Sequence, residues 1–321
     1  MKATRNCLIL GNGASVALQG AASPLTYTSL YSEAEKRGLI SRETSAIFNY
    51  FKSPDFEWVM RSVSHAFEIN KALGIPDNKT TECYNSIKMA LIECVQQVHP
   101  VRDLIRGHFP AMADFMKNFG TVFSLNYDLS VYWSIMEYND PEDPIFKDCF
   151  GYGGSFNFNY ESYREGSTLI FYPHGSLSLV TDLWGNEAKV TADPSGDLLS
   201  SISDKWTIGG KHPLFVSEGD VRKKLQAIRR SRYLNQVYTE LSCPKDSAII
   251  YGWACGEQDS HILAALGQAR INRIGVSVYT GSGDYEEFCS RVKFSIKKIK
   301  GLETAQVDFF DSNGPGGWIA D

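Results

Sequence analysis

The sequence has no pair of cysteines at the C-x-x-C spacing that zinc ribbons and many redox sites use. Its cysteines are odd in number and scattered along the chain: Cys7, Cys83, Cys94, Cys149, Cys243, Cys255 and Cys289. Such cysteine usage is typical of reduced thiols in a cytoplasmic protein. We therefore expect neither a disulfide framework nor a structural zinc or other metal site.

The sequence also lacks an excess of positive charge and a long apolar run. It has 32 Lys and Arg residues against 37 Asp and Glu residues, a formal net charge of −5, so general affinity for nucleic acid is not indicated. No apolar run reaches the roughly 18–20 residues that cross a bilayer, and the N-terminus lacks the apolar region of a signal peptide. A composition of 43% apolar and 21% charged residues predicts a cytoplasmic globular protein with a substantial core.

Short apolar runs alternate with segments of helical periodicity along the chain. Strands are expected at 7–10, 121–125, 168–172, 247–251, 274–279 and 305–310, and helices at 218–242, 259–270 and 284–298. Strands that alternate with helices at this spacing form a parallel sheet covered on both faces. The pattern predicts an α/β class fold of Rossmann-like type.

We expect a single domain over residues 1–321 that contains three insertions. Residues 26–118 follow the first strand and are predicted to be mostly helical, because apolar side chains recur at helical spacing on both sides of a loop. Residues 137–166 and 181–212 are rich in polar residues and glycine and are predicted to be irregular.

The first strand runs directly into the turn Gly11-Asn-Gly-Ala-Ser15. Glycines let the backbone approach a phosphate, and a helix that starts there offers free N–H groups and a partial positive charge. The dehydrogenase fingerprint needs a third glycine where this chain has Val16, and an acidic residue at the end of a second strand. The turn predicts a nucleotide site but disfavours hydride transfer; a plain strand-to-helix turn is the alternative.

Polar residues follow three later strands, where ligands of open α/β sheets bind. Asn126-Tyr-Asp128 could hold a sugar hydroxyl and a carboxamide, and His174 between Pro173 and Gly175 is a candidate acid or base. The loop from Gly252 to Asp259 could approach a nucleotide closely. Each feature has a simpler explanation: an Asx turn, a hydrogen-bonded structural histidine and a helix N-cap at Asp259.

Other charged and titratable residues indicate no site by themselves. A basic cluster lies on the helix near residue 225 and is expected to be a solvated face, with an acidic partner or phosphate as the alternative. The cluster comprises Arg222, Lys223, Lys224, Arg229, Arg230 and Arg232. His261 falls in a predicted helix beside Asp259, and we expect it to be solvated or to cap that helix.

The ordered set of motifs resembles the SIR2-like, or sirtuin-related, NAD-consuming family. In that family a Gly-x-Gly-x-Ser turn follows the first strand, an Asn-x-Asp triplet ends a later strand, and a His-Gly pair and a glycine-containing loop follow. This chain has matching segments in the same order: Gly11 to Ser15, Asn126 to Asp128, His174-Gly175 and Gly252 to Asp259. The segment 215–220, which leads to Ser231, also looks like one bacterial branch of the family.

The resemblance implies that NAD⁺ is the substrate and gives each matching residue a role. Asn126 would contact the nicotinamide-side ribose or position the attacking water, Asp128 would hold the carboxamide, and His174 would be the general base. The implied nucleotide-binding residues are Gly11, Gly13, Ala14 and Ser15 at the pyrophosphate, Gly252, Trp253 and Ala254 beside the adenosine half, and in addition Asn12, Tyr127, Gly175, Ser176 and Asp259.

One departure from the family narrows the expected activity. Sirtuin deacylases carry a zinc ribbon with two C-x-x-C pairs, and this sequence has neither pair. SIR2-like branches without the zinc module are associated with NAD⁺ hydrolysis, often as toxic effectors of bacterial antiphage defence. The resemblance therefore implies an NAD⁺ glycohydrolase that converts NAD⁺ and water to nicotinamide and ADP-ribose.

An unregulated NAD⁺ hydrolase would poison its host, so we expect a control on its activity. Homo-oligomerisation, the helical insertion, or a partner defence protein such as an ATPase or a nucleotide sensor could supply that control. A non-catalytic sensor or regulatory subunit that binds NAD or ADP-ribose is the main alternative. A protein deacylase is disfavoured by the missing cysteine pairs, and a dehydrogenase by Val16.

Overall fold

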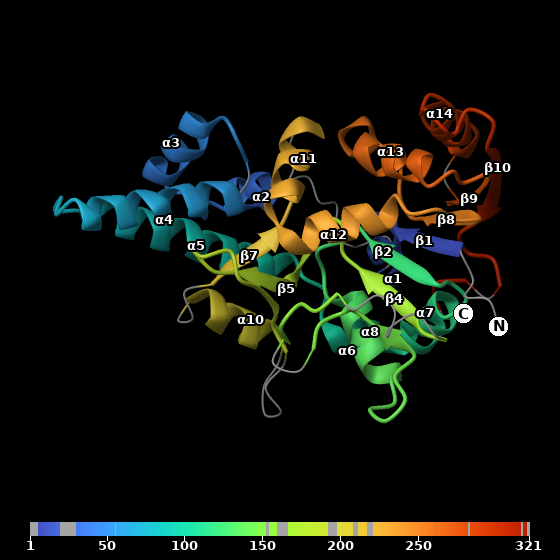
Figure 1. Ribbon diagram of the computed structural model, residues 1–321, viewed down its shortest axis with the longest axis horizontal. Helices are drawn as coiled ribbons and strands as arrows, with labels where there is room; N and C mark the ends of the chain where they lie inside the picture. The colour runs from blue at the N-terminus through green and yellow to red at the C-terminus, as the bar shows by residue number, and fades with distance from the viewer. Residues whose placement is uncertain are drawn as a thin grey trace.

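Figure 1 shows the computed structural model of the chain, in which a large sheet lies between layers of helices. The structure describes residues 6–19, 30–54, 56–151, 154–158, 166–191, 198–207, 211–216, 221–281, 283–315 and 317–319. Parts of the predicted insertions, and residues 217–220 of the segment that supports the family resemblance, lie outside the described residues.

The large sheet has seven strands in the order β10-β9-β8-β1-β2-β4-β3, and its neighbouring strands are parallel. The strands are β1 (Asn6–Leu10), β2 (Thr121–Ser124), β3 (Phe146–Lys147), β4 (Thr168–Phe171), β8 (Ser247–Tyr251), β9 (Arg273–Val278) and β10 (Gln306–Asp311). β2 and β4 are buried along their whole length, because helices cover both faces of the sheet. The predicted Rossmann-like α/β fold is confirmed.

Helices cover the two faces of this sheet. Figure 1 shows α7 (Phe109–Met116) and α8 (Ser130–Tyr138) below it, and α13 (Ser260–Gln268) and α14 (Tyr285–Lys297) above it. α12 (Arg232–Leu241) packs against α13. α1 (Asn12–Gln19) starts directly after β1. No helix in the described ranges has the length and hydropathy needed to span a membrane.

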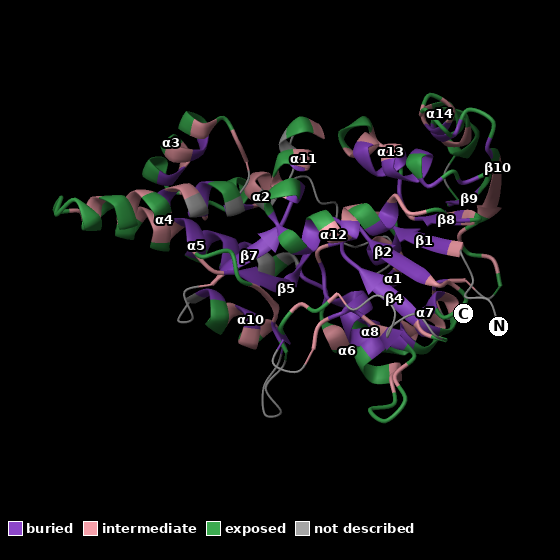
Figure 2. Ribbon diagram, viewed as in Figure 1, coloured by how far each residue is buried: buried purple, intermediate pink, exposed green. Residues whose placement is uncertain are grey.

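The predicted helical insertion consists of several helices between α1 and β2. They are α2 (Leu30–Lys36), α3 (Arg42–Phe51), α4 (Phe56–Ala72), α5 (Lys79–Val98), α6 (Arg102–Ile105) and a 3₁₀ turn (Arg106–His108), followed by α7. α4 and α5 extend away from the sheet as a long arm, whose far end is exposed (Figures 1 and 2). The buried side chains of Phe56, Met60 and Leu91 hold the near end of this arm in the core.

The segments predicted to be irregular contain ordered elements, so that expectation was wrong in part. A second, antiparallel sheet has the order β6-β5-β7. It comprises β5 (Gly175–Thr181), β6 (Glu187–Lys189) and β7 (His212–Phe215), with α10 (Leu198–Thr207) between β6 and β7. β6 and β7 are short. β5 buries polar Ser176 and Ser178, which hides the apolar alternation that would reveal a strand.

One predicted helix is two helices in the structure. The range 218–242 contains α11 (Val221–Arg230) and α12, separated at Ser231. The Ser231 hydroxyl caps α12 by accepting a hydrogen bond from the Leu234 amide at 3.0 Å. Apolar periodicity continues across the break, which explains why the sequence pattern indicates a single helix.

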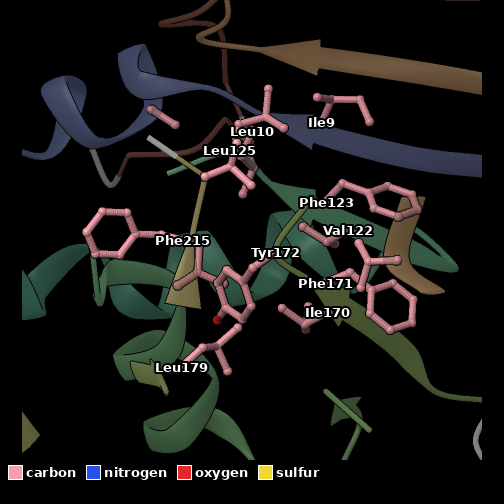
Figure 3. Close-up of a cluster of buried hydrophobic side chains, with 14 of the residues drawn as sticks. Ile9, Leu10, Val122, Phe123, Leu125, Ile170, Phe171, Tyr172, Leu179 and Phe215 are labelled. Atoms are coloured by element: carbon pink, nitrogen blue, oxygen red, sulfur yellow. The ribbon is translucent and has the colours of Figure 1, made fainter. Parts of the chain in front are cut away.

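The cores of the two sheets are continuous. Figure 3 shows apolar side chains of β1, β2 and β4, such as Leu10 and Phe171, leading to Tyr172, Leu179 and Phe215. The Tyr172 amide donates to the Tyr233 hydroxyl at 3.0 Å, which anchors the chain where it leaves β4. The turn between β4 and β5 is therefore held by buried packing on both sides.

We expect Phe215→Ala to lower the free energy of unfolding by about 3–5 kcal/mol, because it leaves a cavity where the two sheets meet. Phe294→Ala is the matched control: Phe294 is 61% exposed, and its removal should change the stability by no more than about 0.5 kcal/mol. Urea unfolding of both variants tests this. Equal losses in the two variants would show that the junction is not well packed.

Candidate functional site

An open cavity of about 1440 Å³ lies along the carboxyl edge of the large sheet. The sheet grows in one direction from β1 through β2 and β4, and in the other direction through β8, β9 and β10. The carboxyl ends of β1 and β8 thus form a topological switch point, where open α/β sheets bind ligands. The cavity exceeds the roughly 300–1,000 Å³ of a typical small-molecule site and has room for a larger ligand.

Two glycine turns are packed directly against each other at this switch point. The Gly11 amide donates to the Tyr251 carbonyl at 2.9 Å, and the Gly13 amide donates to the Gly252 carbonyl at 2.7 Å. A Cβ on Gly11 would overlap the Cβ of Trp253, and one on Gly13 would lie 2.8 Å from the Gly252 oxygen. Gly252 itself has a φ of +67°, so the contact depends on glycine in both turns.

This contact changes the role expected for the first turn. The amides of Gly11 and Gly13 are already hydrogen bonded, and the Ala14 amide donates to the Gly11 carbonyl at 2.9 Å. Ala14 and Ser15 are buried and, in the described part of the chain, do not line the cavity. The turn therefore joins two loops. We had expected the Gly11, Gly13 and Ala14 amides to face a pyrophosphate, but they are engaged within this contact. Gly11, Asn12 and Gly13 still line the cavity.

A buried network connects the first turn to the loop after β2. The Asp128 carboxylate accepts hydrogen bonds from the Ser15 hydroxyl at 2.5 Å and from the Ser130 amide at 2.8 Å. The Asn126 side-chain amide nitrogen donates to the Ser15 hydroxyl at 2.8 Å and to the Gly11 carbonyl at 3.0 Å. This network fixes the orientation of Asn126, which lines the cavity together with Tyr127.

Asp128 lies within this buried network rather than in the cavity wall, whereas the family resemblance implies contact with a carboxamide. It is 2% exposed and, within the described ranges, is not part of the cavity wall. Both of its oxygens accept hydrogen bonds from groups behind Asn126, so the structure gives it a positioning role rather than contact with a carboxamide. In Asn126, the amide nitrogen makes both hydrogen bonds, which leaves Oδ1 to meet a ligand.

His174 lies on the cavity wall in the turn between β4 and β5. Its carbonyl accepts a hydrogen bond from the Val216 amide at 2.7 Å. The next residue, Gly175, has a φ of +79°, and a Cβ there would overlap the Leu214 carbonyl oxygen. Gly175 and Ser176 are buried in β5 and do not line the cavity in the part of the chain described; they hold His174 and are not in a position to contact a nucleotide.

His261 lies directly behind His174, contrary to our expectation of a solvated or capping residue. The two Nε2 atoms are 2.9 Å apart, and His261 is 2% exposed. His261 is in the first turn of α13, 87 residues from His174. Sequence reasoning missed this pair because nothing in the local pattern around either histidine indicates the contact.

Asp259 and Lys224 complete this cluster. The Lys224 ammonium is 2.6 Å from Asp259 Oδ1, which is 3.7 Å from His174 Nε2. Asp259 is at the N-cap position of α13, but its side chain makes no capping hydrogen bond. Lys224 is 4% exposed, so its predicted place on a solvated face was wrong. In the same basic cluster Arg222, Arg229, Arg230 and Arg232 are exposed, and the Lys223 side chain lies outside the described part.

Burial controls the protonation of both histidines. It lowers the pKa of His174 to about 3, since attraction to Asp259 only partly offsets the loss of solvation. Burial also lowers the pKa of His261 to about 4. For Asp259, burial acts to raise the pKa, but the positive charge of His174 in its protonated form and that of Lys224 bring it below its ordinary value. At neutral pH the histidines are uncharged, and Asp259 and Lys224 form an ion pair.

His174, His261 and Asp259 also have the donor types of a transition-metal site, and their ligand atoms lie within 4.8 Å of one another. The Lys224 ammonium, however, is already 2.6 Å from Asp259 Oδ1 and supplies the positive charge that this carboxylate needs. A metal ion could bind these groups only if Lys224 moved away, so the arrangement fits an ion pair better than a metal site.

The far half of the cavity follows the ends of β8, β9 and β10. Trp253 and Ala254 line it as expected, and the Ala254 carbonyl accepts a hydrogen bond from Arg291 at 3.0 Å. Sequence reasoning missed several residues of this wall, including Ser277, Tyr279, Glu287, Ser312 and Asn313. They lie at the end of β9, just after β9 and β10, and in the first turn of α14, without any motif that marks them.

Comparison with known families places this chain in one of them. Residues 8–318 match the family described as "Domain of unknown function (DUF4917)", and the chain belongs to this family. A comparison with curated proteins finds no match.

The buried histidines predict a specific pH dependence of stability. Their folded pKa values lie below the ordinary value of 6.5, so the unfolded chain binds more protons below that pH. The neutral histidines make their full contribution to the free energy of unfolding above about pH 6.5. This contribution falls toward pH 4, by up to about 1.4 kcal/mol per pH unit for each histidine. Unfolding free energies of the double variant His174→Gln/His261→Gln should change less steeply with pH, whereas His65→Gln, at an exposed site, should follow the native curve. An unchanged slope in the double variant would contradict neutral burial.

Gly252→Ala should disrupt the contact between the two turns, because its Cβ would overlap the Ala14 amide nitrogen in a backbone conformation unfavourable for alanine. We expect a loss of at least about 2 kcal/mol in the free energy of unfolding. Gly107→Ala is the matched control, since a Cβ there has open space around it. Thermal unfolding of the two variants tests this, and similar stabilities would show that the turns can separate freely.

Proposed function

We propose that this member of the DUF4917 family hydrolyses NAD⁺ to nicotinamide and ADP-ribose. One observation carries the proposal: His174, Asn126 and the two glycine turns, which are far apart in sequence, line one cavity at the switch point of a parallel sheet. Nucleotides bind at this position in open α/β sheets. The resemblance of the same segments to the SIR2-like family supplies the substrate class.

The chemistry requires little of the protein beyond positioning. Nicotinamide leaves as a neutral molecule, so the transition state resembles an oxocarbenium ion and one water must be aimed at the ribose. Asn126 Oδ1 is available to orient the water or the ribose, because the amide nitrogen is already bonded to Ser15 and Gly11. His174 is neutral at pH 7 and can accept a proton; such general-base assistance is typically worth about 10²–10⁴-fold in rate.

The cavity suggests how NAD⁺ would lie. The nicotinamide ribose would occupy the end formed by Asn126 and His174, and the adenosine half would follow Trp253 and Ala254 along the strand ends. The pyrophosphate would then lie near the N-terminus of α1 at Asn12, where the helix dipole favours an anion. This placement does not need the Gly11 and Gly13 amides, which are engaged elsewhere.

A second candidate is binding of NAD⁺ or ADP-ribose without turnover, as in a sensor or regulatory subunit. The specific observation in its favour is the low pKa of His174, about 3, which makes this histidine a weak base. Its Nε2 atom is also engaged by His261. Deacylation is the weaker proposal, because the sequence lacks the cysteine pairs of the zinc ribbon.

The cellular role belongs to the proposal as well and rests on the family resemblance alone. By that resemblance the protein would be an NAD-depleting effector of bacterial antiphage defence. Its activity would be controlled by self-assembly or by a partner defence protein such as an ATPase or a nucleotide sensor.

The test is NAD⁺ consumption and nicotinamide release by the purified chain, with and without the products of neighbouring genes. His174→Ala and Asn126→Ala should each reduce the rate at least about 100-fold. His65→Ala should retain full activity, because His65 is exposed on α4 and is not part of the cavity wall within the described residues. Thermal unfolding confirms that each variant is folded.

The outcomes separate the two candidates. Full activity of both His174→Ala and Asn126→Ala would rule out this site as the catalytic centre. Tight binding of ADP-ribose by calorimetry, together with no turnover under any condition, would favour the binding protein. A native chain that neither binds nor consumes NAD⁺ would exclude both.

A further inference from the structure

His261 is the group that holds the ring of His174 from behind. It is buried in the first turn of α13, and its Nε2 lies 2.9 Å from the Nε2 of His174. At this distance one of the two nitrogens donates a hydrogen bond and the other accepts it. Since Nε2 of His174 is engaged in this way, Nδ1 is the ring nitrogen left for a ligand or a water.

The position of Asp259 favours His174 as the donor. Its Oδ1 atom is 3.7 Å from His174 Nε2, and a negative charge at this distance favours the hydrogen on that nitrogen. A neutral imidazole carries one hydrogen, so His174 Nδ1 is then unprotonated and can accept a proton. With this assignment the hydrogen of His261 would be on Nδ1, which is buried and without a hydrogen-bond partner in the part of the chain described.

We propose that His261 is a positioning residue for the hydrolysis proposed above: its Nε2 accepts the hydrogen bond of His174 Nε2–H and holds His174 in the tautomer whose Nδ1 accepts the proton. The inference rests on the proposed function for its catalytic consequence. The tautomer itself follows from the contacts of His174 and can be measured without any activity.

The proton balance of the step is simple. The attacking water forms a C–O bond to the ribose carbon as the bond to nicotinamide breaks, and the electron pair leaves with nicotinamide. One water proton moves to His174 Nδ1, and the imidazolium later releases it to solvent. While His174 is charged, its Nε2–H remains bonded to His261, and Asp259 is the nearest negative charge.

Lys224 contributes to the charge around His174 and His261. In the described part of the chain, the charged and titratable groups that act on His174 are His261 from α13, Asp259 from the 3₁₀ turn Glu257–Asp259 before it, and Lys224 from α11. Behind His261, the Tyr238 hydroxyl of α12 donates to its backbone carbonyl at 3.1 Å. Because the Lys224 ammonium partly offsets the charge of Asp259, removing it should strengthen the effect of Asp259 on the imidazolium.

The first test compares two variants of His261 in the NAD⁺ assay. His261→Leu removes the acceptor and should lower kcat by about 10–100-fold, with little change in KM, because His261 does not line the cavity in the described part of the chain. His261→Gln supplies an amide oxygen as the acceptor and should restore kcat to within about tenfold of the native rate. Equal losses in two folded variants would overturn the proposal.

The second test is the pH profile of kcat/KM in Lys224→Met. Loss of the ammonium leaves Asp259 uncompensated, so the acid limb should move to higher pH, by about one unit. In Lys224→Met combined with His261→Leu, the midpoint pH of the acid limb should differ from that in Lys224→Met alone, since His174 then lacks its hydrogen-bond partner. An acid limb that does not move in Lys224→Met would contradict the arrangement of charges.

The third test does not depend on activity. Long-range ¹H–¹⁵N correlation spectra of histidine side chains identify which ring nitrogen carries the hydrogen, and the His174→Gln variant assigns the signal. Native His174 should carry it on Nε2, and His261→Leu should change that state whereas His261→Gln should not. A native His174 with the hydrogen on Nδ1 would overturn the proposal. If the chain shows no turnover but this spectrum is as expected, the proposed function fails and the positioning contact stands.

Discussion

The direct contact between two glycine turns is the constraint on which the rest of this site depends. The sheet grows in opposite directions from β1 and β8, so the loops after these strands must share one crevice. Hydrogen bonds from the Gly11 and Gly13 amides close the loops onto each other, and no side chain fits between them. With the loops joined, the Gly11 carbonyl is placed to accept from Asn126, which links the third segment of the cavity to the first two.

The second constraint is the junction between the two sheets, which holds His174. The chain leaves β4 through buried Tyr172, turns at Gly175 and enters β5, where it packs on β7. This junction removes His174 from water almost completely and brings it against α13. Burial then keeps the imidazole neutral. Beside it, the opposite charges of Lys224 and Asp259 compensate each other in an ion pair. The packing of this site consequently determines the protonation state of His174.

Much of the fold could be predicted from the sequence because local patterns express it. The strand at 247–251 was located at its true bounds, and those near 7–10 and 274–279 to within a residue, because central parallel strands are short apolar runs. The small antiparallel sheet was missed, because β5 buries serines and β6 has only three residues. The break at Ser231 was missed because the apolar periodicity continues through a capping residue.

For the site, the sequence by itself determined which segments carry polar residues at strand ends: the turn at Gly11, the loops at Asn126 and Gly252, and His174. These are properties of adjacent residues, which local patterns record. Only the tertiary structure decided that Asp128 turns toward Ser15, that the Gly13 amide is taken by Gly252, and that His261 and Lys224 join His174 and Asp259. Hydrogen bonds and ion pairs between distant segments are set by the way the strands and helices pack in space, and neither spacing nor composition along the chain specifies those partners.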